Sequence, residues 1–179
     1  MTYDEYLALE ELSDVRHEFL DGQMRALPDG TIESASLRAS LLSLLVPQLR
    51  KQCRVYTFVR VRTDSGLATY PGVAAICGPS IRHVEDNDAI TNPELIVEVL
   101  RPGTEEYNRG ERFEHYKTCA SLREYVLVAL SDRAIELWTR DNDNRWTSTV
   151  VRDGEVAELA IGARLDVREL YEAAEEPKA

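Results

Sequence analysis

The sequence has few cysteines, and their spacing suggests no shared chemistry. Cys53, Cys77 and Cys119 are the only three. Their number is odd, and none lies in a CxxC or cysteine–histidine spacing. We therefore predict neither a disulfide framework nor a zinc site, and expect all three to be buried small hydrophobic residues.

Long hydrophobic runs are also missing. No stretch approaches the roughly 20 apolar residues that a membrane-spanning helix requires. The first residues, MTYDEYLALEEL, lack the basic and apolar regions of a signal peptide. We therefore expect a cytoplasmic protein that does not contact membranes.

Positive charge is scarce. The chain has 21 lysines and arginines against 32 aspartates and glutamates, for a formal net charge of −11. Because a phosphate backbone is attracted to basic surfaces, this balance disfavours non-specific binding of nucleic acid. A local basic groove is still compatible with it.

The composition is otherwise that of a globular protein, with 44% hydrophobic residues in 179. This length suits one domain with a full core. The order of expected helices and strands predicts an α+β fold with a mixed sheet. Since no repeat or linker is visible, we expect residues 1–171 to form one domain and residues 172–179 to be a disordered acidic tail.

Local motifs define the first elements. Thr2 and Glu5 form a capping box that begins an amphipathic helix. Asp21 and Gly22 separate two short extended arms, which predicts a two-residue hairpin whose first arm carries Glu18.

The next segments predict a core helix and two paired strands. Leucines at helical spacing follow from about residue 34, although Pro47 should kink or end that helix early. Residues 53–63 alternate like one continuous strand, and Phe58 lies on its polar-ended face. Residues 67–78 predict the paired strand, in which Pro71 indicates an edge or a bulge.

One carboxylate interrupts an apolar strand. In NPELIVEVLRP, residues 92–102, the residues around Glu98 are apolar on both faces of the strand. An ionised carboxylate is costly to bury without a cation, hydrogen-bond donors or access to water. Glu98 is therefore the first candidate functional residue.

The C-terminal part predicts a helix, a β-meander and a last short helix. The first helix follows the Glu98 strand and continues to about Ala120. A further apolar strand and two more strands then form the meander, in which we expect Trp138 and Trp146 to pack as an aromatic pair. The last helix covers residues 167–171.

In order, these segments resemble the Uma-type family of restriction-endonuclease-like proteins, a branch of the PD-(D/E)XK nuclease superfamily. The resemblance is most specific in TYDEYLALEELSDVRHEFLDGQM, in YPGVAAICGP and in PELIVEVLRPGTEEYNRGERFEHYKTCASLREYVLV. It implies a mixed β-sheet flanked by helices, which agrees with the N-terminal helix and hairpin and the C-terminal β-meander predicted above.

The resemblance also implies a Mg²⁺-dependent endonuclease that hydrolyses DNA. Carboxylates on two strands hold the metal, and a lysine on the following helix orients the attacking water. Glu98 and Glu18 occupy acidic positions of this family pattern and are the implied metal ligands.

The chain departs from the family pattern at most of the other positions, and three of these departures concern the implied active site directly. Gly72 replaces the aspartate expected after Pro71, Phe58 replaces an aspartate of the preceding strand, and Arg112 replaces the lysine. A guanidinium is a poor substitute for a lysine beside a reacting water, and we expect Phe58 to fill the space for ions with hydrocarbon. The sequence therefore predicts a degenerate active site with little or no metal binding.

We hypothesise that an arginine now neutralises Glu98. Arg101 and Arg112 are candidates, together with Arg60 and Arg62 on the face of Phe58. Arg60, Arg62 and Arg101 could also contact substrate phosphates. The alternative is a hydrated Glu98 at the mouth of a cleft.

Three functions follow. The first is a catalytically degenerate protein that acts by binding or assembly, for which we expect a homodimer. The second is an active endonuclease that recruits substitute ligands such as Glu94, Asp64 or Glu105. The third is a nucleic-acid binder that does not cut.

Overall fold

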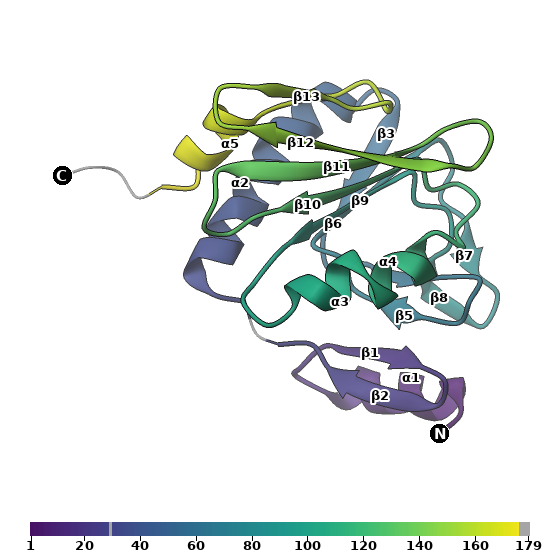
Figure 1. Cartoon of the computed structure of the whole chain (residues 1–179). Coiled ribbons are helices and arrows are strands. Elements are labelled where there is room, and N and C mark those ends of the chain that lie inside the picture. The colour runs from purple at the N-terminus through teal and green to yellow at the C-terminus, as the bar shows by residue number, and fades with distance from the viewer. Residues whose placement is uncertain (29, 176–179) are drawn as a thin grey trace.

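The computed structural model describes residues 1–28 and 30–175, and its centre is a six-stranded mixed sheet (Figure 1). In this main sheet only β9 and β10 run parallel to each other, and the other neighbours are antiparallel. Its strands, in spatial order, are β12 (Trp146–Arg152), β11 (Ala134–Arg140), β10 (Glu124–Val128), β9 (Leu95–Val99), β6 (Val73–Cys77) and β3 (Cys53–Tyr56).

A second six-stranded sheet joins the N-terminal hairpin to the middle of the chain. Its strands, in spatial order, are β2 (Gln23–Ala26), β1 (His17–Leu20), β5 (Ala68–Thr69), β4 (Arg60–Arg62), β8 (Asp86–Ile90) and β7 (Arg82–His83). We call it the N-terminal sheet. A separate pair, β13 (Val156–Glu158) and β14 (Arg164–Asp166), completes the β structure of the described residues.

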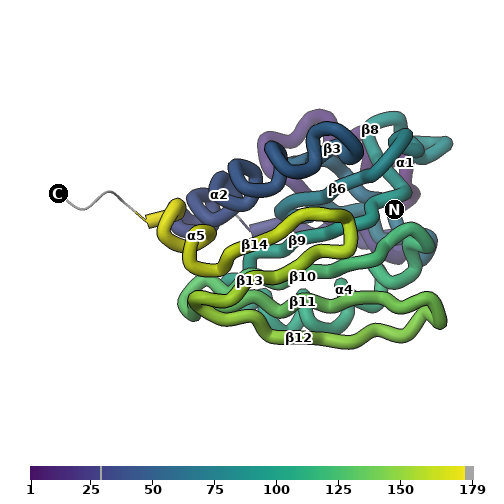
Figure 2. Tube along the Cα trace, turned by 90° about the horizontal axis from the view of Figure 1, so that it is seen from above, coloured from purple at the N-terminus to yellow at the C-terminus, as the bar shows by residue number. Residues whose placement is uncertain are grey.

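Helices cover both faces of the main sheet. On one face lie α2 (Ile32–Leu49) and α5 (Val167–Glu172), together with the β13–β14 pair, as Figure 2 shows from above. On the other face lies α4 (Glu111–Tyr116), which follows α3 (Glu105–Arg109) after a break at Gly110. Helix α1 (Tyr3–Leu12) packs against the N-terminal sheet through Tyr6.

The alternation along β9 determines the direction of Glu98. Leu95, Val97 and Val99 belong to the core beneath α2, whereas Ile96 belongs to the core beneath α4. Since alternate side chains share a face of a strand, Glu98 shares the face of Ile96 and points toward α4.

The local motifs of the N-terminus form as predicted. Thr2 and Glu5 make the reciprocal hydrogen bonds of a capping box at the start of α1. Asp21 and Gly22 both have positive φ angles, 48° and 77°, and connect β1 to β2. The helix does not end at Pro47, because α2 continues to Leu49, whose buried side chain packs the last turn into the core. The kink at Pro47 stays a prediction.

The two strands predicted around residues 53–63 and 67–78 are each divided in two. Residues 57–59 separate β3 from β4, and Tyr70 to Gly72 separate β5 from β6. The chain therefore passes between the two sheets at these corners. At the first corner Phe58 adopts a left-handed conformation with φ 58°, which bulky residues rarely adopt.

The expectation that all cysteines are unpaired is wrong for two of them. Cys53 and Cys77 lie directly opposite each other in the β3–β6 pair and form a disulfide. Cys119 is buried and free, as predicted.

The C-terminal meander of β10, β11 and β12 is confirmed. Trp138 and Trp146 lie on neighbouring strands but are not directly opposite. Each ring contacts Phe113 of α4, with centroid distances of 5.3 and 5.1 Å.

The C-terminal boundary remains a prediction. Helix α5 ends at Glu172, one residue into the predicted tail, and Ala174 packs against the core. Residues 176–179 of that tail lie outside the described residues. Within the described part of the chain, no helix has the length and apolar character needed to cross a membrane.

Candidate functional site

Glu98 is buried where β9 meets the corner before β6. The residue is 6% exposed. Oε2 accepts a hydrogen bond from the backbone N–H of Gly72 at 3.2 Å, and Oε1 accepts one from the hydroxyl of Tyr116 at 3.0 Å. The carboxylate therefore has two protein donors in addition to any cation.

Glu18 is brought to the same place by β1 of the N-terminal sheet. It is also 6% exposed. Its Oε1 accepts a hydrogen bond from Tyr107 at 2.8 Å, and its Oε2 accepts one from Thr69 of the neighbouring strand β5 at 3.3 Å. The two acidic positions implied by the family pattern therefore lie in one site.

Arg112 lies between the two carboxylates. One terminal nitrogen, Nη1, is 3.4 Å from Oε1 of Glu98, and the other, Nη2, is 3.5 Å from Oε2 of Glu18. Nη1 also donates to Asn108 at 3.2 Å, and Nη2 donates to the hydroxyl of Thr69. One guanidinium thus bridges both acids.

The spacing of residues on α4 explains how two side chains of one helix both contact Glu98. Arg112 and Tyr116 are four residues apart, so they share a helix face, and both reach the carboxylate. The break at Gly110 separates this turn from α3, where Tyr107 and Asn108 contact Glu18 and Arg112. The site therefore joins both sheets and both short helices.

The buried charges determine which groups can exchange protons. Burial acts to lower the pKa of Arg112, but Glu98, Tyr116 and Glu18 together hold that pKa above its ordinary value. Burial and then Glu98 raise the pKa of Tyr116 well above the usual range of a phenol. Arg112 therefore stays charged and Tyr116 stays a neutral hydrogen-bond donor, so neither is suited to take a proton from water.

The hypothesis that arginine neutralises Glu98 is confirmed for Arg112. It is wrong for Arg60 and Arg62, because both side chains lie elsewhere. Arg60 forms a two-pronged ion pair with Asp86, at 2.6 and 2.8 Å. Arg62 donates to the carbonyl of Gly66 and packs over the ring of Tyr3.

Arg101 lies beside the site, in the wall of the cleft above it. Its guanidinium donates to the carbonyl of Pro28 at 3.2 Å, and its side chain lines the same cleft as Glu98. Of the three predicted substrate-binding arginines, Arg101 alone is placed beside the site.

The structure explains the glycine at position 72 and corrects the role expected of Phe58. A Cβ atom at Gly72 would lie 2.9 Å from the carbonyl oxygen of Val97, so an aspartate at this position would require a shift of the backbone. Phe58 is 61% exposed. The expectation that it fills the space for ions is therefore wrong, since Arg112 takes that place.

The residues present do not fit the Mg²⁺ that the fold family implies. A cation between Glu18 and Glu98 would have to share the space of the Arg112 guanidinium, and like charges repel. In the described ranges, no cluster of three histidine, cysteine, aspartate or glutamate side chains could hold a metal ion. The substitute ligands considered from the sequence, Glu94, Asp64 and Glu105, do not line the cleft.

A cleft of about 350 Å³ opens over this buried site. Its described walls carry five arginines and three carboxylates, whereas the whole chain has a net charge of −11. The charged lining residues are Asp14, Arg16, Glu18, Arg25, Arg38, Glu98, Arg101 and Arg112. We call this hollow the arginine cleft.

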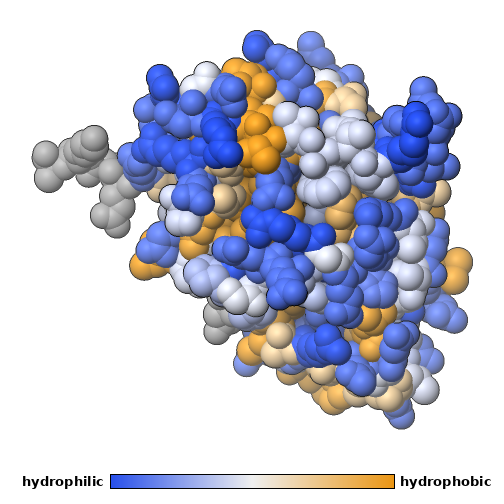
Figure 3. Space-filling model, viewed as in Figure 1, coloured by the Kyte–Doolittle hydropathy of each residue, from blue (hydrophilic) through white to orange (hydrophobic). Residues whose placement is uncertain are grey.

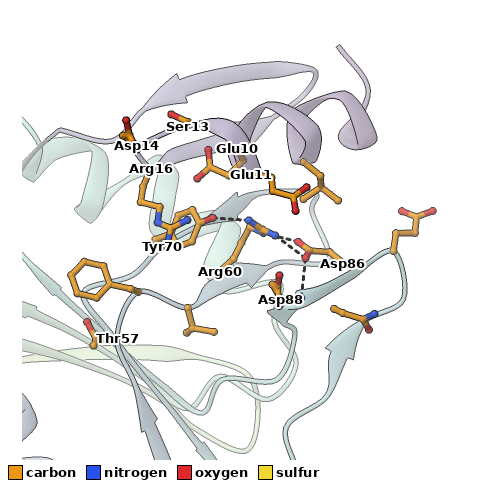
Figure 4. Close-up of a pocket in the computed structure, with 15 residues that line it drawn as sticks. Glu10, Glu11, Ser13, Asp14, Arg16, Thr57, Arg60, Tyr70, Asp86 and Asp88 are labelled. Carbon is orange, nitrogen blue, oxygen red and sulfur yellow. Dashed lines mark hydrogen bonds and ion pairs between the residues drawn. The ribbon is translucent and has the colours of Figure 1, made fainter.

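A second hollow of about 800 Å³ adjoins it (Figure 4). Arg60 lies at its centre, between the hydroxyl of Tyr70 at 2.6 Å and the carboxylate of Asp86. Most of its charged lining residues are acidic, namely Glu10, Glu11, Asp14, Glu85, Asp86 and Asp88. We call it the acidic hollow.

Several residues of the site were not predicted. Tyr107, Thr69 and Asn108 connect the charged side chains to one another. Arg16, Arg25 and Arg38 line the cleft. The only local signal was the position of Asn108 four residues before Arg112, within the helix that the sequence predicts.

Comparisons with known proteins agree with the fold. The sequence matches the Uma2 family model, described as "Putative restriction endonuclease", over residues 3–168. Two proteins of Synechocystis sp. are similar along most of their length. Uncharacterized protein slr1290 is 30% identical over 172 residues, covering 94% of this chain and 90% of the relative. Uncharacterized protein sll1609 is 27% identical over 162 residues, covering 89% and 91%.

A solved structure extends the likeness to three dimensions. The crystal structure of a "putative nuclease belonging to DUF820" from Anabaena variabilis superposes with a TM-score of 0.81. The superposition covers 97% of this chain and 99% of the other, at 14% sequence identity. At that identity the likeness shows the fold alone, and it confirms the predicted restriction-endonuclease-like sheet flanked by helices.

Proposed function

Because the chain belongs to the Uma2 family, we propose that it is a nuclease-fold protein that no longer hydrolyses phosphodiesters and instead acts by binding. The observation that carries this proposal is the position of Arg112, which bridges Glu18 and Glu98 with its two terminal nitrogens. Its positive charge is where the family pattern implies a divalent metal.

An arginine cannot replace the metal chemically. A bound Mg²⁺ neutralises the non-bridging oxygens of the phosphate and activates a coordinated water. A guanidinium has no free coordination position and does not release a proton at neutral pH. Arg112 therefore satisfies the charges of the two acids but supplies no nucleophile.

The first test is metal binding with and without Arg112. In Arg112→Ala, Glu18 and Glu98 lose their shared cation, and a divalent ion can neutralise them instead. We expect Mn²⁺ or Mg²⁺ to raise the melting temperature of Arg112→Ala, because a ligand that binds only the folded state stabilises it by mass action. The wild-type protein should show no such shift and no plasmid nicking.

The matched control is the double variant Arg112→Ala/Glu98→Ala. It keeps the cavity but lacks one of the two acids, so the stabilisation by metal should disappear. The opposite result is saturable binding of Mg²⁺ to the wild type, lost in Glu98→Ala and accompanied by nicking. That result would favour the active endonuclease with substitute ligands.

The arginine cleft favours nucleic-acid binding without cleavage as a second candidate. Its described lining has an excess of arginine in an otherwise acidic chain. Binding that depends on phosphate neutralisation weakens steeply with salt. A DNA affinity that does not change with ionic strength would contradict this candidate.

A further inference from the structure

Phe58 is an exposed aromatic residue at the mouth of the arginine cleft. It has a positive φ angle and a side chain that is 61% exposed. A bulky residue in this conformation is strained, and such strain is concentrated at functional positions. Arg38 packs over the ring at 5.2 Å from its centroid, so the ring has a cationic neighbour and a large solvent-facing area.

Three arginines of the same cleft have no acidic partner among the described residues. Neither Arg16, Arg25 nor Arg38 forms an ion pair with any residue that the structure describes. The Nε atom of Arg38 is buried and has no hydrogen-bond acceptor there. A buried donor without an acceptor is costly, so an anionic ligand that supplies an acceptor would relieve that cost.

The opposite charges of the two adjoining hollows determine how a ligand at Phe58 is oriented. Phe58, Tyr70 and Arg16 line both of them. Beyond this boundary the acidic hollow repels anions, while the arginine cleft attracts them. A ligand on Phe58 therefore places its anionic group on the side of Arg38 and Arg25.

We propose that the arginine cleft binds a nucleoside monophosphate group, with the base stacked on Phe58 and the phosphate held by Arg38 and its neighbours. The volume of about 350 Å³ suits a small ligand. The inference rests on the proposed function, because the phosphate is held and not hydrolysed. The group is either a free mononucleotide or an unpaired nucleotide of a single strand, since a paired base is hidden within its stack.

The test is calorimetric titration with adenosine 5′-monophosphate. Adenosine and ribose 5-phosphate are the comparison ligands, because each lacks one of the two recognised groups. We expect clearly tighter binding of the monophosphate than of either part. Phe58→Leu should weaken it about fivefold or more, since base–aromatic stacking is lost while the apolar volume remains. Arg38→Gln should weaken it and reduce its salt dependence.

Matched controls use exposed residues outside the cleft. Val84→Ala removes an exposed apolar side chain, and Arg145→Ala removes an exposed arginine. Neither residue lines the cleft, so both variants should bind like the wild type. Melting temperatures of all variants establish that each one is folded.

Two further ligands, a single strand and a duplex, distinguish a free mononucleotide from a nucleotide within a strand as the bound group. Single-stranded oligoadenylate that binds more tightly than the mononucleotide indicates an unpaired strand, and weaker binding indicates the free nucleotide. The proposal is overturned if neither ligand binds, if a duplex binds best, or if Phe58→Leu has no effect. Nicking of plasmid with Mg²⁺ would instead overturn the proposed function, whatever the nucleotide affinity.

Discussion

At the scale of single residues, the site depends on one cation shared by two buried acids. Arg112, Glu18 and Glu98 are each 6% exposed. Replacing a complete buried ion pair by apolar residues is often neutral, but removing one partner leaves an uncompensated buried charge. Arg112 is therefore a structural requirement of the present site as well as a barrier to metal.

This predicts a large loss of stability in Arg112→Ala without added metal. Because two buried carboxylates lose their cation, we expect the free energy of unfolding to fall by about 3–5 kcal/mol. Urea denaturation at neutral pH measures it. Arg145→Ala, whose ion pairs are exposed, should change by less than about 1 kcal/mol. Equal effects of the two substitutions would contradict the bridging role.

Glu124 gives a second prediction at this scale. It is 1% exposed, and its Oε1 accepts a hydrogen bond from the backbone N–H of Ala160 at 2.7 Å, while Oε2 has no partner among the described residues. Burial raises its pKa above the ordinary value of 4.5. As pH rises above that value, the unfolded chain loses this proton before the folded chain does, so the folded state loses stability until its own raised pKa is passed.

The measurement compares wild type with Glu124→Gln over that pH window. The amide cannot titrate, so the wild type should lose stability relative to the variant as pH rises from about 4.5 toward neutrality. A difference that stays constant with pH would show that the carboxyl group ionises equally easily in both states.

At the scale of elements, the sequence predicted a local structure correctly only where adjacent residues alone determine it. The capping box of α1 and the Asp21–Gly22 hairpin depend on a few adjacent residues, and both were predictable. The corner at Phe58 was not, because the alternation of residues 53–63 fits one straight strand equally well. Only the second sheet, which pairs β4 with β5 and β8, makes the chain turn there.

The disulfide was missed for the same reason. The separation of 24 residues between Cys53 and Cys77 carries no signal, and their contact requires the exact register of β3 against β6. The site shows a similar division. The isolated carboxylate in an apolar strand predicted Glu98, whereas Thr69 and Tyr107 reach Glu18 only after β5 and α3 are in place.

From the disulfide we predict that reduction destabilises the segment that forms the walls of the site. It closes the segment that carries Phe58, Tyr70 and Gly72, and a loop of this length corresponds to about 3 kcal/mol of stability. We expect dithiothreitol to lower the melting temperature of the wild type. The double variant Cys53→Ser/Cys77→Ser should start lower and not respond. An equal response in both proteins would argue against the bond.

At the scale of the whole molecule, strong negative charge limits how two copies of the chain can associate. The face seen in Figure 3 is mostly hydrophilic, and its hydrophobic residues form small separate groups. With a net charge of −11 on each copy, two chains repel each other at long range. A homodimer therefore requires a contact surface with little charge.

Strand β12 offers such a surface. It forms an edge of the main sheet, and residues 147–150 (TSTV) are exposed and uncharged. An edge strand without lysine or proline is open to pairing with another strand. For the expected homodimer we therefore predict antiparallel pairing of β12 with its copy.

We expect a dimer that strengthens as salt rises, because screening weakens the repulsion between two acidic copies. Sedimentation equilibrium at low and high ionic strength measures this directly. Thr149→Glu places like charges at the centre of the edge and should shift the protein toward monomer. Val84→Glu adds the same charge at an exposed site on the β7–β8 turn and should leave the association nearly unchanged. If both variants dissociate equally, net charge and not the β12 edge controls assembly, and a wild type that stays monomeric in high salt would contradict the dimer.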